Sequence, residues 1–249
     1  MQVLEWSRVL EFLAQHAQSA MGVAQCRSLT LSSDLADACL RQQETTEMVN
    51  LLEGNDPVPA LTFPDIREQL IRSGKGGTLE AGELRDCAVV LALMAEVERY
   101  AESHQGKLQA LVQVLEPLHV TKNLKGVLKA IEGATQSDGS MKDTASPELR
   151  RLTHQAQGLK QEMRQQLEQM LHSKRYEDVL QESYFAQREG RYVVPVKADM
   201  RGRIPGIVHD VSSSGATVFL EPRELVELNN SIKVADLEIE REVQRILRE

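Results

Sequence analysis

The sequence predicts a mainly α protein that carries a small antiparallel β insert between two long helices. Aromatic residues make up only 4% of the chain, and this composition favours helices over a β-sandwich. Apolar residues recur every three or four positions over most of the chain, as on the buried face of a helix. Residues 190–222 differ, because they are rich in β-branched residues and interrupted by glycine and proline, which favours short strands.

The first 145 residues predict one helical core domain. A helix should begin at Ser33 or Asp34, either of which can cap the free amides, and end near Gly54. Three prolines in NDPVPALTFPD exclude a continuous helix after it. Apolar spacing predicts further helices over residues 3–20, 65–72, 79–103 and 107–132.

Residues 133–147 form the clearest hinge in the sequence. Serine, proline and acid then follow one another at Ser146, Pro147 and Glu148, an arrangement typical of a helix start. The apolar stripe that begins there predicts an outgoing helix over 146–180, on the order of 50 Å long at about 1.5 Å per residue.

The segment 223–249 repeats the same apolar spacing after the insert. Two such stripes on either side of a β-rich stretch are typical of an antiparallel helical arm whose tip is the insert. The alternative is that each stripe packs separately on a globular core. The pattern stops at Arg248 and Glu249 without a cap, so we expect a fragment of a longer protein.

The insert, residues 181–222, predicts a small antiparallel meander. Tyr192, Val194 and Val196 alternate with their neighbours as in a half-buried strand, and Pro195 suggests an edge position. Further strands are expected over 206–211 and 216–221, with a turn between them.

Composition and motifs exclude several classes of function. Cys26, Cys39 and Cys87 are odd in number and lack metal-ligand spacing, which argues against a disulfide framework or zinc ribbon. The SGKGGT stretch fails the phosphate-loop spacing, His209-Asp210 has no second ligand cluster, and SSSGA lacks the nucleophile-elbow pattern. We therefore expect no catalytic centre, no metal site and no cofactor site in this chain.

The chain has neither a signal-peptide pattern nor a long uncharged apolar stretch, which predicts a cytoplasmic protein without a membrane partner. Its net charge of −8 repels polyanions, so any nucleic-acid binding needs a local basic patch. Between residues 174 and 203, seven basic and five acidic residues give a local charge of +2. The candidate phosphate-binding residues are Lys174, Arg175, Arg188, Arg191, Lys197, Arg201 and Arg203. An ordinary solvated face with mixed charges is the alternative.

The stretch REGRYVVPVKADMRGRIPGIVHDVSSSGATVFLEP, followed by ELVELNN, closely resembles the second bacterial branch of MutS proteins, which carries a C-terminal Smr nuclease domain. DTASPELRRL and VLEWSRVLEFLAQHA fit the same family, so the resemblance covers nearly the whole chain. It implies a MutS-type core in residues 1–145, an outgoing lever helix over 146–180, a clamp region over 181–222 and a truncated returning lever helix over 223–249.

The resemblance also implies a function. The family binds branched DNA and suppresses homologous recombination, and it senses collided ribosomes and splits them, so ribosomal RNA is a second candidate partner. A P-loop ATPase that binds ATP and Mg and forms the homodimer, and the Smr endonuclease, would lie outside this chain. The competing hypothesis is a scaffold that dimerises through the helical arm without touching nucleic acid.

Overall fold

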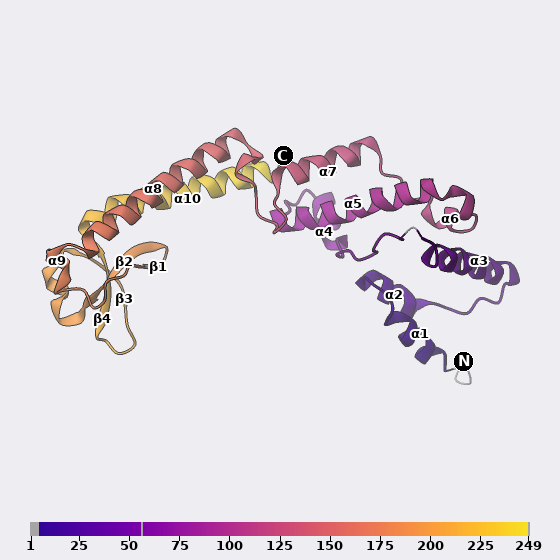
Figure 1. Cartoon of the computed structure of the whole chain (residues 1–249), viewed down its shortest axis with the longest axis horizontal. Coiled ribbons are helices and arrows are strands. Elements are labelled where there is room, and N and C mark those ends of the chain that lie inside the picture. Colours follow the sequence, from indigo (N-terminus) through magenta and orange to yellow (C-terminus); the bar gives the residue numbers. More distant parts are fainter. Residues whose placement is uncertain (1–4, 56, 249) are drawn as a thin grey trace. The chain divides into compact units, whose positions relative to one another are not determined.

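The computed structural model describes residues 5–55 and 57–248, and it confirms a mainly α protein with a small antiparallel sheet (Figure 1). The chain divides into two compact units, one up to Lys142 and one from Asp143 onward. The helices of the first unit are α1 (Trp6–Ala14), α2 (Ala20–Ser28), α3 (Leu35–Leu52), α4 (Arg67–Gly74), α5 (Ala81–Ser103), the 3-10 turn η2 (Gln105–Lys107), α6 (Leu111–Leu115) and α7 (Lys122–Ala134).

In the first unit, some of the expected helices are confirmed and the expected bounds of two helices are wrong. Asp34 caps α3 by accepting a hydrogen bond from Ala36 N at 3.0 Å, as predicted. The helix expected over 3–20 is wrong beyond Ala14, where the chain turns, and its residues Val3 and Leu4 lie outside the described residues. The helix expected over 107–132 divides into α6 and α7 because Pro117 removes an amide donor and Thr121 starts a new helix.

The apolar core of the first unit is small. Leu79, Cys87, Ala88 and Ile131 form a buried cluster between α5 and α7. Elsewhere, one buried carboxylate holds two elements together. Glu47 of α3 accepts hydrogen bonds from the amides of Ala110 and Leu111 at 2.9 Å, and so caps α6 from a distant part of the chain. These bonds keep the pKa of Glu47 below its ordinary value against the opposing effect of burial.

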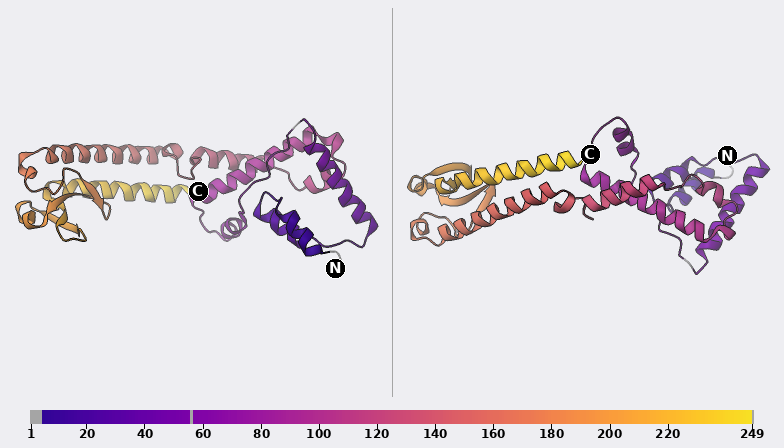
Figure 2. Two further views of the ribbon diagram at one scale, coloured as in Figure 1. Left: turned by 60° about the horizontal axis from the view of Figure 1, so that its bottom comes forward. Right: turned by 90° about the horizontal axis from the view of Figure 1, so that it is seen from above.

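The second unit is an antiparallel helix pair with a sheet at one end (Figure 2). Its helices are η3 (Asp143–Ala145), α8 (Pro147–Leu171), α9 (Lys174–Glu177), η4 (Ala198–Arg203), η5 (Arg223–Leu225) and α10 (Val226–Ile246). Its strands are β1 (Ala186–Arg188), β2 (Arg191–Lys197), β3 (Gly206–Val211) and β4 (Thr217–Pro222), in the order β1-β2-β4-β3.

The two apolar stripes pack on each other, as the arm interpretation predicts. Ser146 at the start of α8 donates to Glu242 near the end of α10 at 2.6 Å, and Lys160 pairs with Asp236 at 2.8 Å. Ser146 also caps α8 by accepting from Leu149 N at 2.9 Å. The start of one helix therefore lies beside the end of the other, and the pair is antiparallel.

The outgoing helix is shorter than expected. It ends at Leu171, so its 25 residues span about 38 Å. The chain then turns at Ser173, which has extended dihedral angles, and the short α9 follows. This turn allows Tyr176, Val179 and Leu180 to enter the core beneath the sheet.

The predicted meander is wrong in its strand order. β2 pairs with β4, whereas β3 lies at the edge and pairs only with β4. The connection η4 crosses from β2 to the far side of β4, which makes this order possible. β2 and β3 follow each other in sequence but are therefore not neighbours in the sheet.

The predicted edge position of Pro195 is also wrong, because β2 has partners on both sides. Pro195 O accepts from Gln181 N at 2.9 Å, so the proline nitrogen faces the segment 179–181 rather than β4. The missing donor thus breaks no bond between β2 and β4. Both faces of β2 are buried, which contradicts the expected half-buried alternation.

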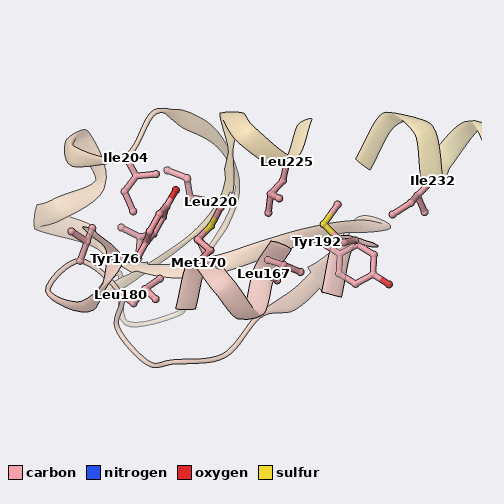
Figure 3. Close-up of a cluster of buried hydrophobic side chains, with 13 residues drawn as sticks. Leu167, Met170, Tyr176, Leu180, Tyr192, Ile204, Leu220, Leu225 and Ile232 are labelled. Atoms are coloured by element: carbon pink, nitrogen blue, oxygen red, sulfur yellow. The ribbon is translucent and has the colours of Figure 1, made fainter. Parts of the chain in front are cut away.

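Helices and sheet share one apolar core in this unit (Figure 3). The cluster takes side chains from α8, α9, the sheet, η5, α10 and the segments that follow α9 and η4, and all of its buried members are less than a tenth exposed. Its buried members are Met163, Leu167, Met170, Tyr176, Val179, Leu180, Tyr192, Val194, Val196, Ile204, Leu220, Leu225 and Ile232.

Candidate nucleic-acid interface

Two contacts bring α9, η4 and η5 to the same end of the sheet. Arg175 Nη1 of α9 lies 2.7 Å from Glu224 Oε1 of η5. Arg223 N of η5 donates to Pro205 O at 2.9 Å, and Pro205 follows closely on η4. Three segments that are distant in sequence therefore meet, and each carries basic residues.

Tyr176 holds this corner in place. Its hydroxyl donates to Glu224 Oε2 at 2.7 Å, while its ring is buried in the core. Burial raises the pKa of Tyr176, and the neighbouring Glu224 carboxylate raises it further. The phenol therefore stays protonated as a donor at neutral pH and orients Glu224 toward Arg175.

Four of the seven predicted contact residues are engaged within the protein. Besides Arg175, Arg188 Nε pairs with Asp210 at 3.0 Å, and its guanidinium lies 4.2 Å from the centre of the Phe219 ring. Lys197 Nζ donates to Asp178 O at 2.9 Å. Such partners reduce the charge that a side chain can offer to a phosphate.

Arg191 is the most deeply engaged of these residues. Its two terminal nitrogens donate to Glu221 at 2.9 Å and to Asn230 at 2.8 Å, and only 28% of the side chain is exposed. Arg191 therefore serves the junction between the sheet and α10 in this structure.

The other three predicted residues are exposed. Lys174 lies on α9, and Arg201 and Arg203 lie on η4. Within residues 5–55 and 57–248, none of their side chains has a hydrogen-bond or ion-pair partner. These three cations can face a polyanion without first breaking an internal bond.

Similarity to known proteins covers the whole chain, although no protein-family model matches it. Endonuclease MutS2 of Geobacillus sp. (strain WCH70) is 35% identical over 247 residues, which are 99% of this chain and 32% of that protein. Endonuclease MutS2 of Symbiobacterium thermophilum is 33% identical over 249 residues, which are 99% of this chain and 30% of that protein.

Over its whole length, the chain is similar to one part of MutS2 proteins. It spans about a third of the length of the MutS2 relatives that it matches. The word endonuclease in their names thus describes proteins about three times as long. The MutS2 match also agrees with the resemblance carried by the GRYVVPVK and GIVHDVSSSGAT stretches.

Arg223 is a further exposed basic residue, which the sequence analysis missed. It is exposed on η5, beside Pro205, and its side chain has no partner among the residues that the structure describes. The local charge count ended at Arg203, twenty residues earlier in the chain. Gly206 at the start of β3 pairs with Pro222 at the end of β4, and this pairing places Arg223 near η4.

The described residues contain no group of three or more His, Cys, Asp or Glu side chains that could hold a metal ion. No helix in the part of the chain that the structure covers combines the length and apolar character needed to cross a bilayer.

Proposed function

We propose that this chain is the non-catalytic core and arm of a MutS2-type protein, and that the sheet end of the arm grips nucleic acid through its phosphates. The observation that carries the proposal is the group of exposed cations without internal partners on three converging segments. We call this group the basic corner, and it consists of Lys174, Arg201, Arg203 and Arg223.

The charge balance of the molecule supports a local grip. The chain carries a net charge of −8, so long-range attraction to a polyanion is weak. Cations that contact phosphates displace condensed counterions, and this provides affinity without reading base sequence. A basic corner at the end of a long helix pair can therefore hold a target while the remaining surface stays acidic.

The targets that we propose are branched DNA and the collided ribosome, with ribosomal RNA as the second polyanion. In the full-length protein, such gripping would suppress homologous recombination or split ribosomes in the cytoplasm. The ATPase, which would bind ATP and Mg, the homodimer contact and the endonuclease belong to parts of a MutS2 protein outside this chain. The similarity to MutS2 proteins supports this assignment.

The test is binding of the chain to a four-way DNA junction, measured by fluorescence anisotropy over a salt series. We expect the triple variant K174E/R203E/R223E to bind at least tenfold more weakly. The negative slope of log affinity against log salt should become shallower by about three, because each phosphate contact contributes about −0.9 to it. Unchanged affinity would contradict the proposal.

The chain offers a matched control with the same change in charge. Arg164, Lys233 and Arg241 are exposed on α8 and α10 and lack partners within the described ranges. The variant R164E/K233E/R241E should retain most of the affinity and slope. Equal losses in both variants would mean that overall charge, not the basic corner, governs binding. Competition between the four-way junction and ribosomes then shows which of the two targets the chain binds more tightly.

The second candidate is a dimerisation scaffold. Leu159 and Ile239 of the helical seam are partly buried within the helix pair and are not free to join two copies. Val234 and Leu237 of α10 are 55% and 39% exposed and form a separate apolar strip. The sedimentation coefficients of V234E/L237E and of the unchanged chain, compared over a range of concentrations, show whether this strip joins two copies and so separate this candidate from the first.

A further inference from the structure

Glu221 is a fully buried carboxylate at the junction of the sheet and α10. Its Oε1 accepts from Arg191 Nη1 at 2.9 Å and from Asn229 Nδ2 at 2.9 Å. Its Oε2 lies 2.6 Å from His209 Nε2. Because a carboxylate oxygen accepts, this short contact requires the hydrogen on His209 Nε2. One side chain thus joins β2, β3, β4 and α10.

Asn229 completes the connection to the helix. Its Oδ1 accepts from Tyr192 N at 2.9 Å, and its Nδ2 donates to Tyr192 O at 3.1 Å. The amide side chain therefore pairs with the backbone of β2 as a neighbouring strand would. Asn230, the next residue of α10, binds Arg191 at 2.8 Å. Two adjacent residues in the early part of α10 thus attach to two adjacent residues of β2.

We propose that this network, consisting of Arg191, His209, Glu221, Asn229 and Asn230, fixes the orientation of the sheet on α10 and so positions the basic corner. The apolar core also joins the sheet to the helices, but apolar contacts are not directional. Hydrogen bonds to a buried carboxylate tolerate little change in distance or angle. Replacing such a group by a packed apolar one often preserves stability, so its role here is to specify the arrangement.

The link to the basic corner follows from chain connectivity and rests on the proposed function. Lys174 lies on α9, which follows α8 of the helix pair, whereas Arg203 and Arg223 are held at one end of the sheet by the β3–β4 pairing. The position of Lys174 relative to these two arginines therefore depends on how the sheet sits on the helix pair. Residues of the network act as positioning residues for the phosphate-binding cations.

The first test measures the orientation directly. Nitroxide labels at S213C in the β3–β4 turn and Q165C on α8, both exposed, report the distance between sheet and helix. The background carries C26S, C39S and C87A so that only these sites react. We expect the distance distribution to be at least twice as wide in N229A and E221Q as in the parent. Amide exchange of Tyr192 should be at least tenfold faster in N229A.

The matched control is E242Q, which removes the carboxylate of Glu242 on α10. Ser146 and Arg245 hold this carboxylate at the other end of the helix pair. It should leave the distance distribution narrow. Circular dichroism of each variant confirms that the helices persist. A distribution as narrow as the parent's in both folded N229A and folded E221Q would overturn the proposal.

The second test separates this inference from the proposed function. Both network variants should bind the four-way junction at least threefold more weakly than the parent, with an unchanged salt slope because the number of cations is the same. Broadened distances with unchanged affinity would refute the positioning role. If the parent chain itself does not bind the junction, the proposed function fails, and the distance measurement still decides whether the network sets the orientation.

Discussion

Arg191 and Arg203 come from the same basic stretch of sequence, but the structure gives them different surroundings. Arg191 faces Glu221 and Asn230 and is largely withdrawn from solvent. Arg203 is exposed, and its side chain has no hydrogen-bond or ion-pair partner among the residues that the structure describes. At the residue scale, the role of each cation is decided by the acceptors that the fold places beside it.

Glu242 provides a pH-dependent prediction at this scale. Hydrogen bonds from Arg245 and Ser146 lower the pKa of Glu242 from 4.5 to about 2. A depressed folded-state pKa contributes stability above pH 4.5, and this contribution is lost as the pH falls toward 2. We expect the urea midpoint of the parent to exceed that of E242Q at pH 7, and the difference to shrink between pH 4.5 and pH 2. A difference independent of pH would contradict this assignment.

At the element scale, the sheet depends on close approach between β3 and β4. A Cβ added at Gly206 would lie 2.3 Å from Glu221 O and 2.5 Å from Leu220 Cδ2. The backbone carbonyl cannot move away without breaking the strand pairing. The glycine is thus required by packing rather than by a turn.

We therefore expect Gly206→Ala to destabilise the second unit by about 1–3 kcal/mol, the usual range for overpacking. Thermal unfolding followed by near-ultraviolet circular dichroism measures the change through Tyr176 and Tyr192. Gly202→Ala is the control, because nothing lies within 4 Å of the added Cβ, and it should have almost no effect. Equal effects of the two substitutions would rule out the close contact as the cause.

The helices of this protein were predictable where local signals were strong. Ser146 and Pro147 mark the start of α8, and Asp34 marks the start of α3, because capping involves only neighbouring residues. The end of α8 at Leu171 was not predictable from spacing, since the apolar pattern continues beyond it. The core under the sheet draws that continuation into a turn, and a tertiary contact overrides a local preference there.

At the scale of the whole molecule, the second unit has a buried apolar core of its own. The buried cluster beneath the sheet consists only of residues from 163 to 232. The contacts that hold the other end of the helix pair, between Ser146 and Glu242, lie in the same unit. Among the described residues, all buried members of this core therefore belong to the second unit.

We accordingly predict that residues 143–249 fold alone. Their far-ultraviolet spectrum should be helical, and they should unfold cooperatively at a midpoint within a few degrees of the matching transition in the whole chain. A gradual, non-cooperative transition of the isolated segment would refute this independence. The measurement also tests the predicted domain boundary near residue 145.

The sequence by itself determined the fold class, the paired apolar stripes and the basic character of the region around residues 174–203, because each of these depends on residue type and on short, regular spacing. Tertiary structure alone decided the order β1-β2-β4-β3, the pairing of Arg191 with Glu221 and the position of Arg223 beside η4. Strand order and ion pairing join residues that are far apart in the chain. Local spacing carries no information about which of them meet.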